Sequence, residues 1–113
     1  MNPLNGKEVA AEQQEVVISA NGLMQGTLPF LEGVRKLVDV RSRLSGTEND
    51  PDFLLFVAIE SQADHIPNAE MRALCSQSWL EKCDAEVNDI AAFYQTAVMA
   101  ACERLVRRFS HAA

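Results

Sequence analysis

The chain has 113 residues, a formal net charge of −6 and a hydrophobic share of 48%. This length fits a single domain over residues 1–113, and the composition excludes wholesale disorder, which needs low hydrophobicity together with high net charge. The acidity and the few aromatic residues disfavour nucleic-acid binding. The longest apolar run, residues 53–59, is far shorter than the roughly 18 residues of a membrane span. Since the first residues lack a secretory signal, we expect a cytoplasmic protein that engages no membrane.

Helical spacing of apolar residues dominates the first half of the chain. It predicts a helix over 7–24, which Gly22 and Gly26 weaken at its end. A second helix is predicted from Thr27, as N-cap with Pro29 in the first turn, to residue 44. Its outer face carries a basic cluster that we interpret as solvated, formed by Arg35, Lys36, Arg41 and Arg43.

A third helix is predicted over 50–62, because Asp50 can cap it and Pro51 suits the first helical position. This segment is apolar almost all round, so we expect it to be the central buried element; a strand is the alternative reading. Residues 64–75 form a connector broken by Pro67 and Asn68, with one helical turn near 70–74.

The last predicted helix runs from about residue 79 to 109 and is capped by Ser76 or Ser78. At about 1.5 Å per residue it is roughly 45 Å long, more than a domain of this size needs for its own core. We therefore expect its end to protrude or to pair with another chain. The fold class is all-α: a compact four-helix domain with an extra short helix and a long C-terminal helix.

The three cysteines have neither a CxxC pair nor the spacing of a zinc site. Cys102 lies within the apolar period of the last helix and is interpreted as a small buried hydrophobe, as is typical of free cysteines. Cys75, in the connector ten residues after His65, keeps a nucleophile reading open.

The negative charge is concentrated in one stretch of the chain. Ten carboxylates lie between Glu48 and Asp89 against only Arg72 and Lys82, which gives a local charge of −8. Such a stretch repels nucleic acid and anionic lipid and favours a basic partner or a cation.

Two acidic groups within this stretch could carry chemistry. Glu60 and Asp64 share a face if the third helix continues past residue 62, and with Asp50 or Asp52 they could hold a divalent cation through oxygen ligands. The second group lies at the start of the last helix, where acids are already explained by the helix dipole. We interpret His65 as organising its turn through Asp64 or a backbone group, with a general-base role as the alternative.

Several short motifs follow one another along the chain. An opening of Leu31, Gly33, Arg35 and Leu37 comes first, and then come the segment Asp50-Pro51-Asp52-Phe53, Glu60-Ser61, Asp64-His65 with Pro67, and finally Trp79, Leu80 and Asp84. With these, the chain resembles a small uncharacterised family of bacterial all-helical proteins that have a DPDF segment and an acidic DHxP turn. The resemblance covers most of the chain and implies a bacterial cytoplasmic origin. The family has no assigned activity, so the resemblance assigns no catalytic residues.

We predict a small acidic protein-binding domain, of an immunity or regulatory type, that meets a basic protein partner by charge complementarity. It needs no cofactor, and we assign neither catalytic residues nor a metal site. The alternatives are a divalent-metal-dependent hydrolase with an acidic site on the third and fourth main helices, and a homodimeric structural protein joined through the long helix. The predicted binding residues are Asp50, Asp52, Phe53, Glu60, Asp64, His65, Glu81 and Asp84.

Overall fold

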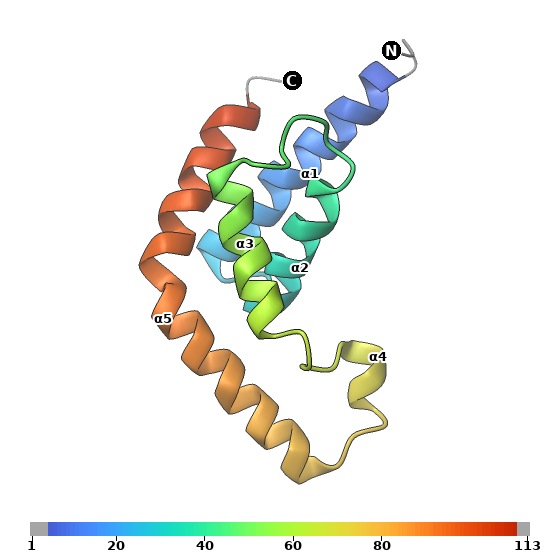
Figure 1. The fold of residues 1–113 in the computed structure, drawn as a ribbon, viewed down its shortest axis with the longest axis vertical. Helices are drawn as coiled ribbons and strands as arrows, with labels where there is room; N and C mark the ends of the chain where they lie inside the picture. The colour runs from blue at the N-terminus through green and yellow to red at the C-terminus, as the bar shows by residue number, and fades with distance from the viewer. Residues whose placement is uncertain (1–4, 111–113) are drawn as a thin grey trace.

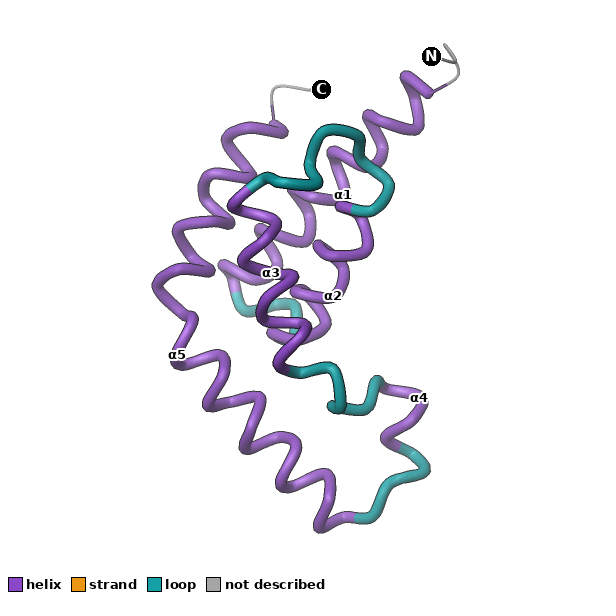
Figure 2. Tube along the Cα trace, in the orientation of Figure 1, coloured by secondary structure: helices purple, strands orange, loops and turns teal. Residues whose placement is uncertain are grey.

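The structure of the protein is a computed structural model that describes residues 5–110. It contains five helices: α1 (Asn5–Gln25), α2 (Phe30–Arg41), α3 (Pro51–Gln62), α4 (Ala69–Arg72) and α5 (Gln77–Phe109). Figure 2 shows that helices and loops make up this whole part of the chain, without a strand. The all-α prediction is confirmed, including the short extra helix and the long C-terminal one. No helix in this range combines the length and apolarity that a membrane crossing requires.

The main core lies between α1, α2, α3 and the second half of α5, which run side by side in Figure 1. Phe53, Phe56 and Ile59 of α3 are all fully buried in it. Each side chain of this size stabilises the fold by about 1.5–3 kcal/mol when removed from water. The prediction of α3 as the hydrophobic centre is confirmed, but α3 is not buried all round, because Leu54 and Ala58 face solvent.

The boundary between α1 and α2 differs from the prediction. Gly26 has a φ of +74°, and the N–H of Thr27 donates to the carbonyl of Gly22 at 3.1 Å, which closes α1 as a Schellman motif. Thr27 therefore belongs to the end of α1 and does not cap α2. The N-cap of α2 is Pro29, which has no capping side chain. The helix also ends at Arg41, three residues earlier than predicted, and 42–44 form tight turns.

The starts of α3 and α5 follow from their capping residues, as predicted. Asp50 accepts a hydrogen bond from the N–H of Asp52 at 3.0 Å, so the third segment is a helix and not a strand. At the start of α5, the Oγ of Ser76 accepts from the N–H of Trp79 at 3.2 Å, which makes Ser76 the cap.

The first half of α5 extends beyond the main bundle, and a short loop joins its start to α4 (Figure 1). It is held there by a second, smaller cluster of buried residues: Leu31, Ala63, Ile66 and Cys83. The long helix therefore connects the main core to a separate end of the molecule, built from α4, the connectors on either side of it and the first turns of α5.

Candidate functional site

Asp50 and Asp52 are held in ion pairs with the C-terminal arginines. Arg104 Nε donates to Asp52 Oδ1 at 2.8 Å, and Arg108 Nη1 donates to Asp50 Oδ1 at 3.1 Å and to Asp52 Oδ2 at 3.2 Å. The side chains of Asp52 and Asp50 are only 9% and 11% exposed. The hydrogen bond from Arg108 lowers the pKa of the Asp50 carboxyl. The start of α3 is therefore neutralised and tied to the end of α5.

Phe53, which was predicted to contact a partner, lies in the core. It is fully buried and packs edge-on against Phe109 with ring centroids 6.2 Å apart. Its role is to join α3 to α5, and the structure places it out of reach of any partner.

Apart from Glu48, which lies in the loop before α3, the remaining carboxylates of the acidic stretch lie at the other end of the molecule. Seven of them, which we call the acidic end, occupy the last turns of α3, the connector, α4 and the first half of α5: Glu60, Asp64, Glu70, Glu81, Asp84, Glu86 and Asp89. Only Arg72 and Lys82 are basic between residues 60 and 89. Figure 1 shows these elements opposite the start of α1 and the end of α5.

Two polar contacts organise the acidic end. Arg72 donates to both carboxylate oxygens of Asp84, at 2.8 and 3.1 Å, which ties α4 to α5 and lowers the pKa of Asp84. His65 Nε2 lies 2.9 Å from Glu86 Oε1. The interpretation of His65 as bonded to Asp64 or a backbone group is thus corrected, because its partner comes from α5.

The acidic residues do not converge on a cation site. Since α3 ends at Gln62, the condition under which Glu60 and Asp64 would share a helical face is not met. Within residues 5–110, no group of three or more His, Cys, Asp or Glu side chains is placed to hold one metal ion.

The cysteines differ in their surroundings. Cys102 is fully buried, as predicted, and burial raises its pKa to about 12. Burial also raises the pKa of Cys83. Cys75 is half-buried, and its Sγ lies 3.3 Å from the carbonyl of Met71, to which it donates. The two buried thiols are structural, because the reactive form is the thiolate.

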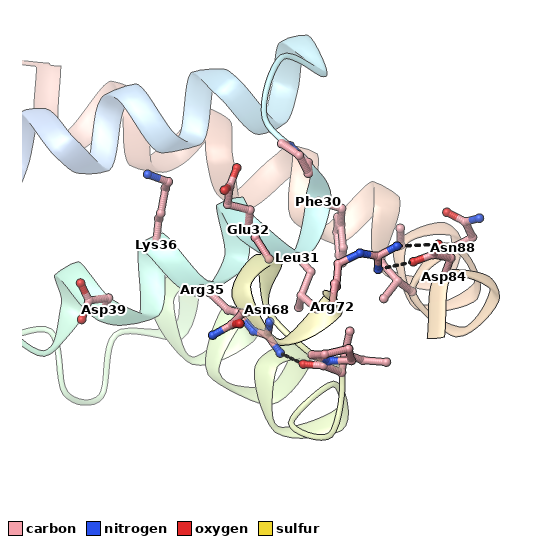
Figure 3. Close-up of a pocket in the computed structure, with 16 residues that line it drawn as sticks. Phe30, Leu31, Glu32, Arg35, Lys36, Asp39, Asn68, Arg72, Asp84 and Asn88 are labelled. Carbon is pink, nitrogen blue, oxygen red and sulfur yellow. Dashed lines mark hydrogen bonds and ion pairs between the residues drawn. The ribbon is translucent and has the colours of Figure 1, made fainter. Parts of the chain in front are cut away.

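A groove of about 680 Å³ opens between α2, the connector after α3, α4 and the first half of α5 (Figure 3). Residues at helical spacing form its two walls: Glu32, Arg35, Lys36 and Asp39 from α2, and Asp84, Val87, Asn88 and Ala91 from α5. Leu31 and Ile66 supply apolar surface between the walls. Phe30 and Ala91 also border a smaller cavity of about 360 Å³ beside the end of α1.

The basic face of α2 proves to be more than a solvated surface. Arg35 Nη2 donates to the carbonyls of Ala63 and Ile66 at 3.1 and 2.8 Å, and so satisfies backbone groups at the end of α3. Arg41 donates to the carbonyl of Glu48 at 2.7 Å, and Arg43 pairs with Glu12 at 2.8 Å. Sequence reasoning missed these three roles and the groove, since the partners lie up to 31 positions away.

No family model matches the sequence, and neither a curated protein nor a solved structure is detectably similar to it. The resemblance to a bacterial helical family therefore stays a prediction.

Proposed function

We propose that the protein is a binding domain that engages a basic protein partner through the acidic end. The observation that carries the proposal is the separation of charge along the molecule. Asp50 and Asp52 are neutralised by arginines, whereas the seven carboxylates of the acidic end share Arg72 and Lys82 as their only nearby bases in sequence. These residues alone carry a formal charge of −5, and Arg35, whose guanidinium reaches the carbonyls of Ala63 and Ile66 from α2, leaves −4.

Exposure favours recognition at this end. Asp64, Glu70, Glu81 and Asp89 are all exposed. A single exposed ion pair is worth about 1 kcal/mol or less, so affinity requires several of them acting together with other contacts. The main effect of such a field is faster and more selective encounter, and salt screens it over about 10 Å at 0.1 M.

An immunity-type or regulatory role is the finer form of this proposal, and it rests on size and charge. Metal-dependent hydrolysis has less support, because the carboxylates of residues 5–110 are spread over separate elements without forming a ligand cluster.

Capture from native lysate at low salt tests the proposal with two charge-matched triple variants. The first neutralises the acidic end by Glu70→Gln, Glu81→Gln and Asp89→Asn. The second neutralises Glu8, Glu48 and Glu103, which are exposed and lie elsewhere. We expect a basic protein that elutes at moderate salt to be retained by the wild type and the second variant and lost by the first. Equal retention by all three proteins would refute recognition through the acidic end.

A further inference from the structure

The groove between α2, α4 and α5 has the dimensions of a small-molecule site. Its volume of about 680 Å³ lies within the roughly 300–1,000 Å³ typical of such sites. Leu31, Ile66 and Val87 offer apolar surface along it, and Phe30 and Ala91 border both this groove and the smaller cavity. An apolar ligand body could therefore leave water over much of its length.

Arg35 places a fixed cation in this apolar setting. Its Nη2 group is anchored on the carbonyls of Ala63 and Ile66, which determines where the guanidinium lies (Figure 3). A guanidinium has five N–H donors, so Nε and Nη1 retain three. Nε and Nη1 of Arg35 are not among the buried side-chain atoms that lack a hydrogen-bond partner. Arg35 can therefore donate to a ligand without giving up its structural bonds.

The formal charges that line the groove balance, three basic side chains against three acidic ones, but not all of them are paired. Among the acids that line it, Asp84 is paired with Arg72, and Asp39 is paired with Arg43. Within the part of the chain that the structure describes, Arg35 forms no ion pair with a carboxylate.

Lys36 likewise forms no ion pair with a carboxylate in that part of the chain. Arg35 and Lys36 thus line the groove as cations without an ion-pair partner among the described residues.

From these features we propose that the groove binds a small amphipathic carboxylate, a molecule with an apolar body and a single anionic group. The body lies along Leu31, Ile66 and Val87, and the carboxylate accepts hydrogen bonds from Arg35. Such a charge-assisted bond is roughly twice as strong as a neutral one. The groove borders the acidic end that we propose for a basic partner and shares Asp84 with it, but the carboxylate site does not depend on that proposal.

Titration with decanoate, followed by calorimetry and amide chemical shifts, tests the site on the full chain. We expect saturable one-site binding with shifts at Ile66, Asn68 and Asn88. Decanol, which has the same chain without the charge, should bind at least tenfold more weakly. An absence of saturable binding, equal binding of decanol, or shifts confined to Met24 and Met99 in the smaller cavity would each overturn the proposal.

Two variants locate the contacts. Arg35→Gln should weaken decanoate binding at least tenfold, whereas Arg107→Gln, which removes an exposed charge near the end of α5 away from the groove, should leave it unchanged. Since Arg35 also holds the end of α3, a second variant avoids this contact: Asn88→Trp fills the groove from an exposed position. It should abolish binding, and Ala58→Trp on the exposed face of α3 should not. Unchanged binding by Asn88→Trp would refute the placement.

Discussion

Asp50 has two separable tasks at the start of α3, and two substitutions distinguish them. Its carboxylate accepts from the N–H of Asp52 at 3.0 Å and forms an ion pair with Arg108, whose Nη1 lies 3.1 Å from Oδ1. Asp50→Ala removes both interactions. Asp50→Asn retains an oxygen that can cap the helix and removes only the charge.

The magnitudes follow from exposure. Losing a helix cap costs about 1 kcal/mol. The ion pair is partly solvated, with side-chain exposures of 43% for Arg108 and 11% for Asp50, so its loss adds at most about 1 kcal/mol. We expect the free energy of unfolding to fall by about 2 kcal/mol for Asp50→Ala and by about 1 kcal/mol or less for Asp50→Asn.

Urea unfolding followed by circular dichroism at neutral pH measures these changes. Asp64→Ala is the control, since it removes an exposed carboxylate and should stay within about 0.5 kcal/mol of the wild type. Equal losses for the alanine and asparagine variants would refute the capping argument.

The same ion pair predicts how stability responds to acid. The hydrogen bond from Arg108 lowers the pKa of Asp50 below its ordinary 3.8 in the folded state. A pKa lowered by folding contributes stability that is complete above the unfolded value and is lost as pH falls through the folded one. Asp50→Asn should therefore flatten the fall in stability below about pH 4. Parallel curves for variant and wild type there would contradict this.

Three further predictions concern packing and thiol reactivity. Gly33→Ala would place a Cβ 2.5 Å from Leu23 Cδ2, and it should lower the free energy of unfolding in urea by about 1–3 kcal/mol. If Leu23→Ala, added to this variant, recovers no part of that loss, the contact with Leu23 is not its cause. Phe56→Ala should cost about 3–5 kcal/mol, because its side chain is fully buried, and a loss below about 1 kcal/mol would mean that α3 is not the centre of the core. In the folded protein at mildly alkaline pH, a thiol-specific chromogenic disulfide should react with Cys75 well before Cys102, whose pKa is raised by burial to about 12. Comparable rates would contradict the burial of Cys102.

Much of the fold could be predicted from short-range signals. Asp50 and Pro51 start α3 and Ser76 starts α5, because a capping side chain bonds to N–H groups two or three residues away. The start of α2 was placed wrongly: Thr27 has a capping type of side chain, but α2 begins only after Pro29, and the N–H of Thr27 donates to Gly22 at the end of α1. The positive φ of Gly26 belongs to the turn that ends α1.

The amino-acid sequence by itself determined the helical class, the apolar character of α3 and the concentration of negative charge in one stretch. Only the tertiary structure decided which of those charges stay free, because Asp50 meets Arg108 from 58 positions away. It also decided that Arg35 lies in a groove. Helix formation depends on neighbours within about four residues, whereas ion pairing and burial depend on which helices pack together, and local patterns do not encode that choice.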